Sequence, residues 1–257
     1  VTVLWIELAP ALLERWRGGS HPELSRIAER AHTILSRAMP FIVALGLLLP
    51  TMHQSSLGSL MLLAETKLPA LWLTPMLPLL FLVSCVTMGF AVVVLESSLS
   101  VLAFRRKPET QMLASLFTAA AISSAVFLAL RFGDLWLRGH LGDAFVLDGD
   151  ALLFWAETAF LAAPILLALG PRRHRRLGLL FRSAVLLILA GALYRFDVYL
   201  IAFDPGTGWA YFPATPEILV TLGLVAAEVM AYVAIVKRFP ILAGAPQTPE
   251  PNLEAAS

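Results

Sequence analysis

The chain has 257 residues, of which 58% are hydrophobic and only 14% are charged. Soluble domains carry about 25% charged residues, so this composition excludes a soluble protein and indicates an integral membrane protein surrounded by lipid. The net charge is only +1, and the basic residues cluster beside apolar segments, which argues against a nucleic-acid partner. The single cysteine, Cys85, excludes an internal disulfide. It also excludes an iron–sulfur cluster held by this chain, because such a cluster needs about four protein ligands.

The chain divides into four parts by composition. Residues 1–17 are apolar up to a basic flank but too few to cross a bilayer, and they are interpreted as the end of a truncated transmembrane helix. Residues 18–37 are polar with spaced aliphatic side chains, which favours a cytoplasmic connecting segment on the membrane surface. Residues 38–240 form the predicted transmembrane domain. Residues 241–257 carry three prolines and no core-forming pattern, so a disordered cytoplasmic tail is expected.

Six segments of the transmembrane domain are long and apolar enough to cross the bilayer as helices, since a crossing needs roughly 20 residues. In chain order they are about 38–63, 77–103, 111–137, 151–169, 177–203 and 213–237. The predicted fold is therefore all-α. It is a polytopic transmembrane helix bundle with six complete spans plus a partial N-terminal helix.

The connections between the spans alternate in charge. Clusters of arginine and lysine follow the second, fourth and sixth spans, whereas residues 203–217 contain neither. By the positive-inside rule, the basic connections and the C-terminus face the cytoplasm. The chain is thus predicted to be a multi-pass membrane protein whose C-terminus is cytoplasmic.

His53, Gln54 and Ser56 interrupt the first complete span and form the predicted quinone-binding group. Polar groups at membrane depth usually face a partner, a cavity or a ligand, because hydrocarbon offers them no hydrogen bonds. Pro50 can kink the helix and open space for a flat ring. A histidine that donates to a quinone carbonyl suits this chemistry, because quinone reduction adds protons as well as electrons. The competing interpretation is interhelical packing through small and hydroxyl side chains.

Several carboxylic acids lie in or near the spans, and we expect them to line a proton path. They are Glu7, Glu96, Glu157, Asp197 and Glu228. A carboxyl group in a low-dielectric medium favours its protonated form, which suits it to relay protons. The alternatives are an interhelical hydrogen bond for the deeper acids and an ion pair with the basic flank for Glu96.

Charged side chains near the outer ends of two spans also need partners. Arg131 and Asp134 are three positions apart, which predicts a local ion pair. Arg195 and Asp197 are two positions apart and cannot face each other on a helix, so each needs a partner on another element. Tyr194 and Arg195 are therefore expected to line a polar channel.

Haem and metal ions are not expected from the residues alone. Membrane cytochromes commonly hold haem b between two histidines on facing helices, but only His53 lies at membrane depth. The sequence also contains no cluster of histidine and carboxylate at metal-ligand spacing, no glycine-rich phosphate loop and no nucleophile motif.

Three segments together resemble one known family. They are residues 49–60 (LPTMHQSSLGSL), 71–80 (LWLTPMLPLL) and 211–223 (YFPATPEILVTLG). With them, nearly the whole chain is similar to the NrfD/polysulfide-reductase membrane-subunit family, and most similar to its HybB-like branch. Members of that branch are associated with nickel–iron hydrogenases and often carry the label "b-type cytochrome".

The resemblance implies a quinone-reactive membrane subunit that exchanges electrons with a ferredoxin-like iron–sulfur subunit on the outer side. That subunit would connect to nickel–iron hydrogenase subunits, so this chain would not carry the substrate half-reaction itself. Its substrate would be menaquinone or ubiquinone, and it would hold no haem. Some relatives couple electron transfer to proton translocation through buried acids. Family members have more than six helices, so the resemblance also implies a missing N-terminal portion.

Three other functions stay open at this stage. The chain could anchor a molybdopterin oxidoreductase that oxidises quinol, because nothing in the sequence sets the direction of electron flow. A secondary transporter would use the intramembrane acids, Arg195 and Pro50 along a substrate path. A purely structural anchor would use the same polar residues only to pack helices.

Overall fold

The computed structural model describes residues 22–64, 67–104, 109–146, 148–170, 176–208 and 211–238, with positions 6, 9, 10 and 13. Six long helices account for most of these residues. They are α2 (Pro22–Leu62), α3 (Leu77–Phe104), α4 (Thr110–Arg138), α5 (Gly149–Leu169), α6 (Leu177–Phe196) and α7 (Thr215–Arg238). Six helices in the described part are long and apolar enough to cross a membrane. The predicted all-α helix bundle is therefore confirmed.

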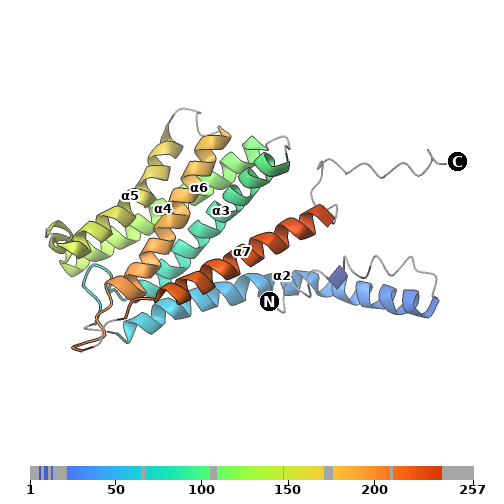
Figure 1. Ribbon diagram of the computed structural model, residues 1–257, viewed down its shortest axis with the longest axis horizontal. Coiled ribbons are helices and arrows are strands. Elements are labelled where there is room, and N and C mark those ends of the chain that lie inside the picture. The colour runs from blue at the N-terminus through green and yellow to red at the C-terminus, as the bar shows by residue number, and fades with distance from the viewer. Residues whose placement is uncertain are drawn as a thin grey trace.

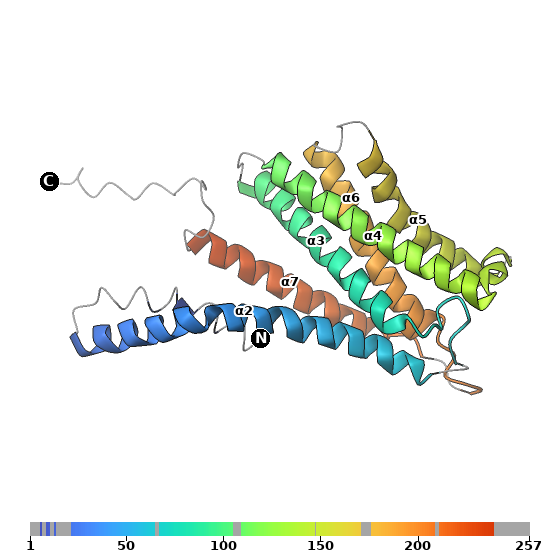
Figure 2. The same ribbon diagram turned by 180° about the vertical axis from the view of Figure 1, so that it is seen from behind.

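The helices α3, α4, α5 and α6 pack together as a bundle, α2 packs against α3 at its edge, and α2 and α7 diverge from each other along their length (Figures 1 and 2). Aromatic side chains fill the interior of the bundle and are almost fully buried. They include Phe81, Phe117, Phe127, Phe154 and Tyr194. Because the helices are apolar nearly all round, packing against neighbours decides which of their faces is buried.

Short polar signals set several helix ends next to the connecting loops. Helix α4 ends at Gly139, whose φ of 77° is the left-handed conformation that glycine adopts without strain. Helix α5 begins where the Asp148 side chain accepts a 2.8 Å hydrogen bond from the Ala151 amide. At the start of α7, the Glu217 carboxylate reaches back and accepts a 2.7 Å bond from the Ala214 amide. These features fix where α4 ends and where α5 and α7 begin.

Helices α2 and α7 bury little of their surface in this chain. In each of them, the most apolar 18-residue window is 0% buried, compared with 39% for the corresponding window in α3. Helix α2 continues without a break from the predicted connecting segment into the first predicted span, with Pro40 and Pro50 inside it. The polar residues of the first span therefore sit on a helix that meets the bundle along one side only.

Two glycines allow close helix contacts that place the candidate site. A Cβ atom added at Gly58 of α2 would lie 2.6 Å from the Leu77 carbonyl oxygen at the start of α3. A Cβ atom added at Gly191 of α6 would lie 2.3 Å from the sulfur of Met88 on α3. Small residues at such crossings let transmembrane helices approach closely. Gly58 thereby brings α2 against the start of α3, and Gly191 brings α6 against α3 about three turns further along.

Candidate functional site

The three residues predicted to bind quinone do not share one side of α2. His53 and Ser56 are exposed, and the Ser56 hydroxyl donates a 2.8 Å hydrogen bond to the His53 carbonyl of its own helix. Gln54 is half-buried, and its side-chain oxygen accepts a 3.1 Å hydrogen bond from Nη2 of Arg195 on α6. The structure thus brings Gln54 to Arg195 and leaves the imidazole of His53 open on an adjacent face.

Arg195 is held by neutral groups. Its Nη1 donates to the Gly191 carbonyl at 2.9 Å and to the Met88 sulfur at 3.1 Å. Its guanidinium carbon lies 5.7 Å from the centroid of the Phe81 ring. Among the described residues, no carboxylate forms an ion pair with Arg195. We call Gln54, Met88 and Arg195 the Arg195 site; it presents a half-buried cation that an electron-rich oxygen could approach.

A second polar site lies inside the bundle, between α4 and α5. Arg131 Nη1 donates to Oε2 of Glu157 in an ion pair whose two side chains are 3% and 0% exposed. Trp72 Nε1 donates a 3.1 Å hydrogen bond to the other oxygen of Glu157. The Arg131 guanidinium also lies 4.3 Å from the centroid of the Phe154 ring. Glu157 is therefore fixed by two donors from different parts of the chain.

Tyr194 and Asp197 complete this second site. Both are buried, and Asp197 is in a π-helical turn, Asp197–Ile201, that continues α6. Both oxygens of Asp197, the Tyr194 hydroxyl and Arg131 Nη2 find no hydrogen-bond partner among the described residues. Asp197 nonetheless interacts electrostatically with Glu157 and Arg131. We call Trp72, Arg131, Glu157, Tyr194 and Asp197 the Arg131 cluster.

The predicted ion pair between Arg131 and Asp134 is wrong. Asp134 instead accepts a 2.7 Å hydrogen bond from Arg138, one turn further along α4. Arg131 faces the interior of the bundle because it lies four positions after the buried Phe127, on the same face of the helix. That spacing is the signal in the sequence that could have identified Arg131 as an interior cation. No comparable local signal identifies Trp72, which lies in the connection between α2 and α3.

The Phe81 ring lies between the two polar sites. Its centroid is 5.4 Å from that of Tyr194, in the Arg131 cluster, and 5.8 Å from that of Tyr199. The Tyr199 hydroxyl donates a 2.7 Å hydrogen bond to the Leu57 carbonyl of α2, near Gln54. Phe81 of α3 therefore lies against Tyr194, which belongs to the Arg131 cluster, and against Arg195.

Two of the other predicted proton-path residues meet in a cavity on a different part of the bundle. Glu96 of α3 and Glu228 of α7 line a cavity of about 440 Å³, together with Ser100 and Tyr232. The remaining lining residues are mostly apolar. The acids thus fall into two groups, one around Arg131 and one in this cavity, while Glu7 lies outside the described residues.

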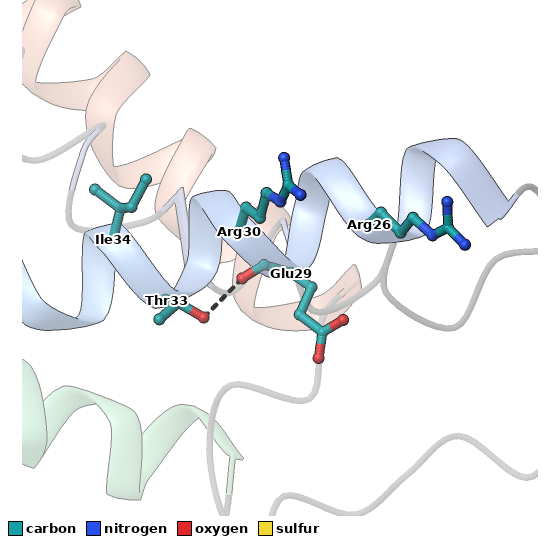
Figure 3. A pocket seen from close by; sticks show the side chains of 5 residues that line it. All are labelled: Arg26, Glu29, Arg30, Thr33 and Ile34. Carbon is teal, nitrogen blue, oxygen red and sulfur yellow. Dashed lines mark hydrogen bonds between the residues drawn. The ribbon is translucent and has the colours of Figure 1, made fainter.

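A further pocket of about 440 Å³ lies along the N-terminal part of α2 (Figure 3). It is lined by Arg26, Glu29, Arg30, Thr33 and Ile34. Thr33 donates a 2.9 Å hydrogen bond to the Glu29 carbonyl within the helix. None of the residues predicted for quinone or proton binding lines this pocket.

Comparison with known proteins identifies curated relatives. The "Probable Ni/Fe-hydrogenase 2 b-type cytochrome subunit" of Escherichia coli K12 is 38% identical over 245 residues, covering 94% of this chain and 60% of the relative. A protein of Nitratidesulfovibrio vulgaris, whose name states no function, is 29% identical over 273 residues, covering 94% of this chain and 62% of the relative. The chain therefore spans about 60% of the length of these curated relatives. No family profile and no solved structure matches it.

The predicted resemblance to the hydrogenase-associated, HybB-like branch is confirmed by the Escherichia coli relative. The prediction of no haem is wrong on the same comparison, because that relative is named a b-type cytochrome subunit, which denotes a haem protein. The described residues fit a haem in part. The exposed imidazole of His53 is available as one axial ligand, whereas His32 lies six turns away on the same helix and His140 lies beyond the end of α4. Within the described ranges, no group of three or more metal-ligating side chains occurs.

Proposed function

We propose that this chain, as a relative of a hydrogenase-associated membrane subunit, passes electrons between an iron–sulfur partner and the membrane quinone pool. The single observation that carries the proposal is the alignment with the Escherichia coli subunit over 94% of this chain. The partners would be a ferredoxin-like iron–sulfur subunit and nickel–iron hydrogenase subunits on the outer side of a bacterial inner membrane. The C-terminus would then face the cytoplasm, as the basic connections indicate.

The proposed reaction is balanced across two proteins. The hydrogenase partner would oxidise hydrogen to two protons and two electrons. At the membrane subunit, a quinone would take up two electrons and two protons and become a quinol. Hydrogen-bond donors and nearby acids are what this second half-reaction requires from the protein.

His53 and Arg195 are the proposed donors to the quinone oxygens. The His53 imidazole is exposed on α2, and the Arg195 guanidinium donates a hydrogen bond to the next residue, Gln54. A charged donor strengthens its hydrogen bond as negative charge develops on the quinone oxygen. Ser56 lies on the same face as His53 and would act as a nearby hydroxyl group.

A haem held by His53 would compete with quinone for the same imidazole. When bound, such a group would supply one-electron transfer along the path from the iron–sulfur partner. Spectroscopy of the purified complex separates the two uses of His53. A haem absorption band that His53→Ala abolishes would assign the ring to haem instead of quinone.

The buried acids are proposed to carry protons in two groups. Glu157 and Asp197 would serve the part of the bundle next to Phe81, and Glu96 and Glu228 would serve the cavity between α3 and α7. Glu7 would belong to the same path. Replacing Glu96 and Glu228 by glutamine should slow quinone reduction and the proton uptake that accompanies it in vesicles, without preventing assembly.

The decisive experiment is hydrogen-dependent quinone reduction by the full-length complex in native membranes. His53→Ala should abolish most activity while the complex still assembles, and His53→Gln should retain part of it by keeping a donor. His140→Ala is the matched control, because His140 lies in an outer connection and is paired with Asp143. Unchanged activity in His53→Ala would refute the assignment. If a molybdoenzyme co-purified in place of hydrogenase subunits, the catalytic partner would be that molybdoenzyme and not a hydrogenase.

A further inference from the structure

The two buried acids of the Arg131 cluster have different surroundings. Glu157 accepts hydrogen bonds from Arg131 and Trp72, one on each of its oxygens. Asp197 is equally buried, yet neither of its oxygens has a hydrogen-bond donor among the described residues. The sequence predicts the same proton-path role for both residues, but their contacts in the bundle differ.

The cluster contains one permanent positive charge for two carboxyl groups. That charge is the guanidinium of Arg131, since arginine is a cation in proteins. The positive charge of Arg131 is balanced by its ion pair with Glu157, whose other oxygen accepts a hydrogen bond from Trp72. A second ionised carboxylate, buried without a donor, would cost far more than a neutral acid in the same place. Charge balance therefore favours Glu157 as the ionised partner and Asp197 as the neutral one.

The other groups around Asp197 do not change this balance. Asp150 of α5 interacts with Asp197 and adds only further negative charge. Tyr194 lies three positions before Asp197 on α6, and its hydroxyl group has no described partner. Arg195 is directed to Gln54, on the other side of Phe81. Arg131 is thus the cation that both carboxyl groups share.

We propose that Asp197 binds one exchangeable proton, and that Glu157 is a positioning residue that stays ionised and holds Arg131 in place. The Arg131 cluster is then a proton-binding site in the bundle interior, separated from the Arg195 site by the Phe81 ring. A hydronium ion would give its proton to Asp197 and leave water, and the reverse step would release it. This inference deepens the proton-path part of the proposed function but does not depend on quinone binding.

Infrared spectroscopy of the resting full-length complex tests the assignment. The spectrum of wild type minus Asp197→Asn should contain the carbonyl stretch of a protonated carboxyl group, shifted in D2O. The matched control is Asp134→Asn, which removes an acid one turn from Arg131 that is paired with Arg138 instead. Its difference spectrum should lack that band. An ionised-carboxylate signal in the Asp197→Asn difference, in place of the carbonyl band, would overturn the proposal.

Assembly gives a second readout that needs no infrared band. Asp197→Asn replaces a neutral acid by a neutral amide, so the yield of assembled complex should stay within about twofold of wild type. Glu157→Gln leaves Arg131 without its counter-ion, so the yield should fall on the order of tenfold or more. Equal losses in both variants would show that Asp197 shares the ion pair and would overturn the proposal. Both readouts use resting protein, so a failure of quinone reactivity would not affect them.

Discussion

Arg195 and Gln54 are 141 positions apart in the chain, yet Nη2 of Arg195 donates a 3.1 Å hydrogen bond to Oε1 of Gln54. The bond connects α6, in the bundle, to α2, which is otherwise little buried. It also places a cation next to the residue that follows His53. The packing of these two helices therefore creates a polar site that neither helix contains alone.

Gln54→Leu should lower hydrogen-dependent quinone reduction about tenfold. The substitution keeps the volume roughly constant and removes the acceptor that orients the Arg195 guanidinium, and a hydrogen bond to a charged group is worth about 1.5–3 kcal/mol. The measurement is the rate in native membranes, divided by the amount of assembled complex. Ser59→Ala is the control, because the exposed Ser59 hydroxyl donates to the Ser55 carbonyl in its own helix and has no part in the proposed site. A Gln54→Leu rate equal to wild type would contradict the role of this contact.

Arg131→Met should destabilise the bundle by about 3–5 kcal/mol, because it leaves the buried Glu157 carboxylate without its counter-ion. The double variant Arg131→Met, Glu157→Leu should recover most of that loss, since apolar residues of similar volume replace a buried ion pair at little cost. Thermal unfolding of the detergent-solubilised complex measures both effects. If the double variant were as unstable as Arg131→Met, the loss would come from packing and not from the stranded charge.

Trp72→Phe should lower stability by about 1–3 kcal/mol and leave the ion pair of Arg131 in place. Trp72 is 1% exposed and donates to Glu157, whereas phenylalanine retains most of the ring but lacks the N–H group. Trp136→Phe is a matched control, because the Trp136 side chain is 75% exposed. Thermal unfolding midpoints of the two variants provide the comparison. Equal shifts would mean that the hydrogen bond to Glu157 contributes nothing.

Gly58→Ala should destabilise the contact between α2 and α3 by about 1–3 kcal/mol, because overpacking forces the helices apart. The new Cβ atom would lie 2.6 Å from the Leu77 backbone oxygen, so the backbone of one of the two helices would have to shift. Gly89→Ala, in the middle of α3, should be neutral or stabilising, because nothing lies within 4 Å of its added Cβ atom. The measurement is protease cleavage of α2 in membranes, which should become faster when α2 separates from α3. Equal resistance in the two variants would show that α2 does not rely on this crossing.

The number, order and approximate bounds of the spans could be predicted from the sequence, because hydrocarbon selects continuous apolar helices wherever they occur. The six predicted spans match the six helices, and the clearest difference is that α2 begins well before its predicted span. The resemblance in three segments likewise identified the hydrogenase-associated branch. The absence of haem was predicted from the histidine count, and the name of the Escherichia coli relative contradicts it.

The sequence by itself determined which polar residues enter the membrane, since each interrupts an apolar run that can be read locally. Only the tertiary structure decided their partners. Spacing paired Arg131 with Asp134, but the rotation of α4 in the bundle turns Arg131 toward Glu157 and leaves Asp134 to Arg138. The sequence also grouped Gln54 with His53 as candidate quinone ligands, but contact with α6 directs Gln54 to Arg195. A helix that is apolar on every side carries little information about its own rotation, so the neighbours against which it packs determine where its few polar groups point.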